Sequence, residues 1–113
     1  MLKTVDWKLS VQLANNNADT AQELLDMMRD ELPQAKQLLI ASFQAQDAKR
    51  LASEAHKLHG GCCYCGLPKL KELIRSLEIA AKEQPPILDS ELFDMTMAEI
   101  DQVIESLNRR DYR

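Results

Sequence analysis

The residue types that could carry chemistry are concentrated in one short stretch, residues 56–66. The stretch contains both histidines, all three cysteines and all three glycines of the 113-residue chain, and it reads His-Lys-Leu-His-Gly-Gly-Cys-Cys-Tyr-Cys-Gly. An imidazole can act as a nucleophile, a proton carrier or a metal ligand, and a thiolate can bind metal. No Gly-rich phosphate loop and no Ser-His-Asp set accompanies these residues. A self-contained enzyme is therefore not expected.

Helical geometry separates this stretch into two faces. At about 100° per residue, His56 lies on the solvent side, whereas His59 and Cys63 lie at the boundary. Gly60 follows His56 by one turn and would leave a gap beside its imidazole. Because Gly inside a helix costs roughly 1 kcal/mol relative to Ala, we expect a partner to approach the backbone there. The opposite, apolar face consists of Leu51, Ala55, Leu58, Cys62 and Cys65.

Composition favours one all-helical domain. Apolar residues make up 45% of the chain and aromatic residues only 4%, and the net charge is −4. Without a basic run, a nucleic-acid partner is not expected. No apolar run approaches the length of a membrane span, so direct membrane contact is not expected. Three clustered cysteines make a poor disulfide framework and favour a cytoplasmic setting.

Periodicity and capping signals predict short helices at the front and four longer ones behind them. Asp6 is a candidate cap for the first, and Asn15–Asn17 should break the chain after it. Residues 19–22 can form a capping box, and Pro33 should end that helix or open the next. The expected helices are 5–14, one after the capping box that carries Leu24, Leu25 and Met28, 34–46, one from the Asp47 cap through Cys65, 69–82, and one from Asp89 or Ser90 to the charged tail 109–113.

Short connections make neighbouring helices antiparallel. The expected fold is therefore all-α, an antiparallel up-and-down four-helix bundle with one or two short extra N-terminal helices. No strand alternation, internal repeat or low-complexity tract suggests another architecture.

The stretch His56-Lys57-Leu58-His59-Gly60, closed by Gly66, resembles the signature of histidine-containing phosphotransfer (HPt) domains. It is most similar to the version in the C-terminal domain of BarA/GacS-type hybrid sensor histidine kinases. The resemblance covers nearly the whole chain and implies that residues 1–113 form a single phosphotransfer domain. It implies that His56 accepts a phosphoryl group from a receiver-domain aspartate and passes it to a response-regulator aspartate.

The resemblance also assigns roles to residues around His56. The family usually has Lys where this chain has His59, so His59 is expected to support the phosphoryl group less strongly and in a pH-dependent way. Glu78 falls where the family places a polar residue that orients the imidazole, and Gly60 gives the partner access. The expected partner-binding residues are Lys49, Ala52, Ser53, Lys57, Lys71 and Lys82.

The same resemblance implies the setting. The partners would be the receiver domains of a hybrid kinase and of a response regulator, and the domain would be a monomeric phosphocarrier without an ATP site. No cofactor or metal is expected in the chain itself, since Mg²⁺ would be held by the receiver. The location would be cytoplasmic, with the chain as the cytoplasmic end of a larger membrane-bound sensor kinase.

Two alternatives remain from the residues themselves. His56, His59 and Cys63 lie at i, i+3 and i+7, a spacing that can bind zinc, but a fourth ligand is not evident. Cys62 and Cys65 should instead point into the core as small apolar residues. The other alternative is a helical interaction module without phosphotransfer, which would leave Gly60 and Gly61 unexplained.

Overall fold

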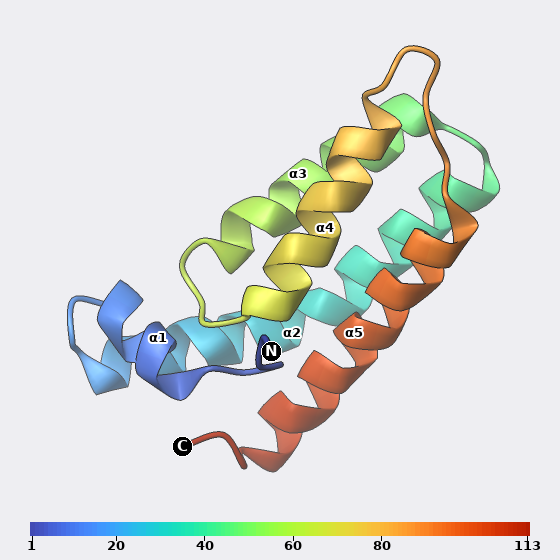
Figure 1. Ribbon diagram of the computed structural model, residues 1–113. Coiled ribbons are helices and arrows are strands. Elements are labelled where there is room, and N and C mark those ends of the chain that lie inside the picture. Colours follow the sequence, from blue (N-terminus) through green and yellow to red (C-terminus); the bar gives the residue numbers. More distant parts are fainter.

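The computed structural model describes all 113 residues, and its regular elements are all helices (Figure 1). Helices α2 to α5 pack in a ring, each against its sequence neighbours and α2 against α5, and α1 lies against the first part of α2. This arrangement confirms the expected bundle with one short extra helix. None of the helices has the length and apolarity needed to cross a membrane. The helices are α1 (Trp7–Leu13), α2 (Ala18–Gln44), α3 (Ala48–Cys62), α4 (Pro68–Ala81) and α5 (Ser90–Arg109).

The core is formed by the faces that the apolar spacing predicted. All five apolar residues named for the His56 helix are buried. Burial of one such aliphatic side chain contributes about 1.5–3 kcal/mol, so this face fixes the rotation of α3 about its axis. Between α2 and α5, Phe43 and Phe93 stack with ring centroids 4.1 Å apart. The rotation of α3 in turn determines which of its residues face solvent.

The expectation that Pro33 separates two helices is wrong. Helix α2 runs unbroken through Pro33 for 27 residues. The ring of Pro33 is exposed, while Leu32 before it and Leu39 after it are fully buried in the same core. Continuous burial on the inner face outweighs the missing backbone hydrogen bond on the solvent side.

Helix ends follow the predicted caps in most places. Asp6, Asp47 and Asp89 each cap the following helix through a side-chain oxygen that accepts a backbone N–H. The 19–22 capping box is wrong, because Asn17 is the cap and accepts a hydrogen bond from the N–H of Thr20. Asn15 and Asn16 have positive φ, as a break before α2 requires.

The His56 helix ends earlier than predicted, at Cys62, and a turn follows. Gly66 in this turn is joined to the start of α1. Its N–H donates to Ser10 Oγ at 2.9 Å, and its carbonyl accepts from the N–H of Asp6 at 2.8 Å. A Cβ at Gly66 would collide with the Asp6 carbonyl and with Ser10 Oγ. These two hydrogen bonds fix the α3–α4 turn to the start of α1, an arrangement called the Gly66 lock below. Only glycine fits at this position.

Gly66→Ala should lower the free energy of unfolding by about 1–3 kcal/mol, the usual range for forcing an extra carbon into a packed site. Gly60→Ala is the matched control, because nothing lies within 4 Å of a Cβ at Gly60 and no glycine here has positive φ. That control should raise stability by up to about 1 kcal/mol. Urea unfolding of the parent protein and the two variants measures both effects. A Gly66→Ala protein with the same free energy of unfolding as the parent would show that the Gly66 lock does not require glycine.

Candidate functional site

His56 lies in the middle of α3 on the surface opposite the core. Its side chain is 69% exposed, and its ring Nδ1 lies 2.9 Å from Oε2 of Glu78 on α4. With Glu78 ionised, Nδ1 must carry the proton to make this hydrogen bond. The other ring nitrogen, Nε2, then keeps a free lone pair on an exposed side chain. An unprotonated, accessible imidazole nitrogen is a nucleophile.

Glu78 is almost completely buried, with 1% of its side chain exposed. Lys82 Nζ donates to the same Oε2 at 2.6 Å, and Arg75 Nη1 lies 3.8 Å from Oε1. Burial by itself raises the pKa of this carboxyl, but the hydrogen bonds from Lys82 and His56 bring the net pKa below its usual value. Glu78 is therefore ionised at neutral pH and can act as a fixed acceptor for His56.

His59 lies one turn after His56, half-buried at the edge of α3. Its Nδ1 is 4.0 Å from Cys63 Sγ. Burial, and then the positive charges of Arg75 and Lys71, lower the pKa of His59, with only partial compensation by Glu78. His59 is therefore neutral at pH 7 and offers a hydrogen-bond donor in place of the charge that a lysine would bring.

The two adjacent glycines of α3 serve different purposes. A Cβ at Gly61 would come within 2.9 Å of the Met28 side chain, so Gly61 accommodates the packing of α2. A Cβ at Gly60 would meet nothing within 4 Å. Gly60 thus leaves open space on the surface one turn from His56.

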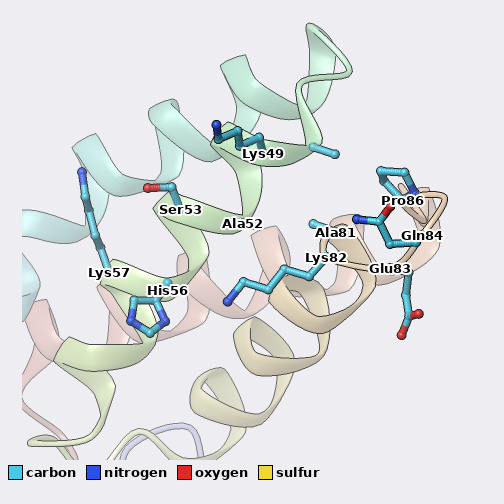
Figure 2. Close-up of a pocket in the computed structure, with 11 residues that line it drawn as sticks. Lys49, Ala52, Ser53, His56, Lys57, Ala81, Lys82, Glu83, Gln84 and Pro86 are labelled. Carbon is cyan, nitrogen blue, oxygen red and sulfur yellow. The ribbon is translucent and has the colours of Figure 1, made fainter.

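A groove runs beside His56 between the first half of α3 and the end of α4 (Figure 2). Five of the six residues predicted to bind a partner line it, with Ala52 buried at its floor: Lys49, Ala52, Ser53, Lys57 and Lys82. The sequence did not indicate the far wall, which is formed by Glu83, Gln84 and Pro86 after α4. Only the three-dimensional packing of this loop against α3 brings the two walls together.

Lys71 lies outside that groove. It lines a second hollow with His59 and Arg75, whose wall also includes Leu2 and, at the end of α1, Leu13. Arg75 was not among the predicted site residues, although it stands one helical turn before Glu78 and so shares its face of α4. Lys71 and Arg75 of α4, with Lys82 directly after the helix, form a basic edge alongside the two histidines in a chain of net charge −4.

Two of the three cysteines, Cys62 and Cys65, are core residues, whereas Cys63 is half-buried. Burial raises the pKa of Cys62 to about 12 and that of Cys65 to about 11, so both remain thiols. His56 is bonded to Glu78, whereas His59 approaches Cys63. No group of three His, Cys, Asp or Glu side chains converges as metal ligands would.

Comparison with known proteins places this geometry in a family. The Hpt domain family model matches residues 19–110. The protein is similar to the signal transduction histidine-protein kinase BarA of Escherichia coli (strain K12), at 29% identity over 108 residues, 94% of this chain. It is similar to the sensor histidine kinase GacS of Pseudomonas protegens, at 30% identity over 83 residues, 74% of this chain. The chain spans only 12% and 9% of the lengths of these two relatives.

A solved structure agrees with the sequence relatives. The crystal structure of the HPT domain from an Hpt sensor hybrid histidine kinase from Shewanella has a TM-score of 0.87 and 30% identity. The alignment covers 94% of this chain and 92% of that one. The chain belongs to the Hpt domain family, whose members in hybrid histidine kinases serve phosphorelay in two-component signalling. It is homologous to the C-terminal Hpt regions of BarA and GacS.

The lowered pKa of His59 predicts a pH effect on stability. Below about pH 6.5 an unfolded chain protonates this imidazole, while the folded protein resists protonation until a lower pH. Unfolding therefore takes up a proton in that window, and the free energy of unfolding falls as the pH drops through it. His59→Gln should remove this part of the decline.

Urea unfolding of the protein and of His59→Gln at pH 7.5 and 5.5 isolates the contribution, because all other groups are shared. An NMR titration of the His59 ring gives the midpoint directly. A midpoint at or above 6.5 in the unphosphorylated protein would contradict the burial argument.

Proposed function

We propose that His56 is the phosphoacceptor of a phosphorelay: it takes a phosphoryl group from the phospho-aspartate of one receiver domain and gives it to the aspartate of another. The observation that carries this proposal is the exposed imidazole whose Nδ1 is engaged by an ionised, buried Glu78. The Nε2 lone pair is directed to solvent, where a partner can present a phosphorylated side chain.

The first transfer requires only the His56 imidazole and the phosphorylated aspartate of the receiver. The Nε2 lone pair forms a bond to phosphorus as the bond between phosphorus and the aspartyl oxygen breaks, and the carboxylate leaves with that electron pair. The imidazole becomes positively charged, and its Nδ1–H stays hydrogen-bonded to Glu78. The second transfer reverses these steps with a new carboxylate as the nucleophile.

Glu78 acts as a positioning residue in both steps. It holds the Nδ1–H tautomer and fixes the ring plane, so the barrier is lowered by orientation. Its negative charge also stabilises the positive ring that forms at each transfer. Since the phosphoryl group arrives on a protein side chain, the domain needs no ATP site. Mg²⁺ would be held in the acidic site of the receiver.

The lysines of the groove and the open surface at Gly60 both favour binding of the receiver beside His56. Lys49, Lys57 and Lys82 line the groove beside His56, and they complement the acidic phosphorylation site expected of a receiver. Gly60 leaves the surface beside His56 open. His59 is assigned a supporting role as a neutral donor to the phosphoryl oxygens.

The assignment of the phosphoacceptor is tested by comparing His56→Gln with His59→Gln. Incubation with a phosphorylated receiver, followed by peptide mapping of the acid-labile label, measures the site. His56→Gln should abolish labelling with little change in melting, because the side chain is largely exposed. His59→Gln should retain labelling at a reduced rate.

Labelling that survives in His56→Gln and disappears in His59→Gln would reverse the assignment. An interaction module without chemistry predicts no label in either variant or in the parent protein.

Gly60→Gln tests access. A Cβ at Gly60 meets nothing within 4 Å, and Gln has a higher helix propensity than Gly, so stability should be equal to or above that of the parent protein. Transfer from the receiver should nevertheless slow by about tenfold or more, since misplacing a partner by about 1 Å can cost roughly a hundredfold. Gly60→Ala serves as the small-residue control. Quenched time courses of the transfer give the rates. A Gly60→Gln protein that accepts the phosphoryl group as fast as the parent would show that Gly60 is not needed for access of the receiver.

A further inference from the structure

Two cationic side chains, Lys82 and Arg75, approach the single negative charge of Glu78. Lys82 Nζ and His56 Nδ1 share its Oε2, while Arg75 stands near its Oε1. Oε1 is buried and has no hydrogen-bond partner. A buried carboxylate that loses its only partner is strongly destabilised. This carboxylate has a second cation within reach, so Lys82 can leave it without leaving the charge unpaired.

Lys82 is placed to use that freedom. Because its Nζ and His56 Nδ1 contact the same oxygen atom, the two nitrogens lie close together. More than half of the Lys82 side chain is exposed. Figure 2 shows its amine directed toward the His56 ring, whereas that of Lys57 points away from it. A flexible four-carbon stem allows the amine to move by several ångströms.

In the unphosphorylated protein, burial and the charges of Arg75 and Lys71 lower the pKa of His59. The permanent positive charge that contacts the same carboxylate oxygen as His56 is that of Lys82, whose Nζ shares Oε2 of Glu78 with His56 Nδ1. We propose that Lys82 is the cation that binds the phosphoryl group on His56, and that Glu78 holds it in place until that group arrives. On phosphorylation the amine exchanges the Glu78 carboxylate for a phosphoryl oxygen, and Arg75 closes on the free Oε1. This inference rests on the proposed function and names a residue that completes it.

The exchange follows from charge. A phosphoryl group on His56 adds negative charge within reach of Lys82, and a lysine amine is a good point-charge partner for phosphate. Glu78 keeps its hydrogen bond from Nδ1 throughout, so the ring orientation survives the departure of Lys82. The phosphorylated state is thereby stabilised although position 59 of α3 holds a histidine and not a lysine.

The test uses the isolated domain phosphorylated with phosphoramidate, a small-molecule donor that needs no receiver. Phosphorus-31 NMR follows the phosphohistidine resonance through a pH series for the parent protein, Lys82→Gln and Lys82→Arg. A cation in contact lowers the pKa of the phosphoryl group. Lys82→Gln should therefore titrate at higher pH than the parent protein, and Lys82→Arg should resemble the parent.

Equilibrium with a phosphorylated receiver provides the second readout. Lys82→Gln should shift the distribution of phosphoryl groups away from His56 by roughly fivefold, the size expected for one well-aligned exposed ion pair. Lys57→Gln is the matched control on the same groove. It should slow the encounter with the receiver in a salt-dependent manner and leave the titration of the isolated phosphohistidine at the parent value.

The outcomes separate the two proposals. A parent domain that takes up no phosphoryl group on His56 removes the proposed function and the role of Lys82 together. A phosphorylated parent whose Lys82→Gln variant titrates and distributes as the parent does overturns only the role of Lys82. A lowered melting temperature in Lys82→Gln with an unchanged phosphorus titration also overturns it, because that result describes a structural ion pair.

Discussion

The structure around His56 depends on one buried carboxylate at the contact between α3 and α4. Glu78 lies inside the bundle with 1% of its side chain exposed and accepts hydrogen bonds from His56 and Lys82. A charge in that position is tolerated only when it is paired and hydrogen-bonded. The need to pair it ties an exposed side chain of α3 to α4, and so gives a surface imidazole a defined orientation. Without Glu78, His56 would be an ordinary mobile surface residue.

The rest of the fold sets the distance at which this pairing occurs. The buried face of α3 fixes its rotation, and the lock between Gly66 and the start of α1 holds the turn that leads into α4. The small residues of α3 let α2 pack close on one side and leave the surface near His56 open on the other. The same bundle core therefore supports two separate requirements, rigid placement of the imidazole and unobstructed approach of a partner. Both requirements suit the proposed role of holding and presenting a phosphoryl group.

Much of this arrangement follows from local signals. The position of His56 off the apolar face, the Asp6 and Asp47 caps and the burial of Cys62 and Cys65 depend on periodicity and nearest neighbours, and all agree with the structure. The errors arose where tertiary packing overrides a local rule. Pro33 lies inside α2 because the residues around it are buried continuously. The role of Arg75 and the far wall of the groove depend on which helices meet, and no single segment encodes that. The three basic residues that approach Glu78, two cations and one neutral imidazole, could be listed from the sequence, but their convergence on one carboxylate could not.

The proposed phosphotransfer depends on Glu78 holding His56 as the Nδ1–H tautomer with a free Nε2. Long-range proton–nitrogen correlation NMR on the unphosphorylated protein, above the pH at which the ring is protonated, distinguishes the two tautomers directly. We expect a protonated Nδ1 and an unprotonated Nε2 for His56, and a loss of this preference in Glu78→Leu, which cannot accept the hydrogen bond. A His56 ring that carries its proton on Nε2 in the parent protein, or a preference unaffected by Glu78→Leu, would show that Glu78 does not set the tautomer.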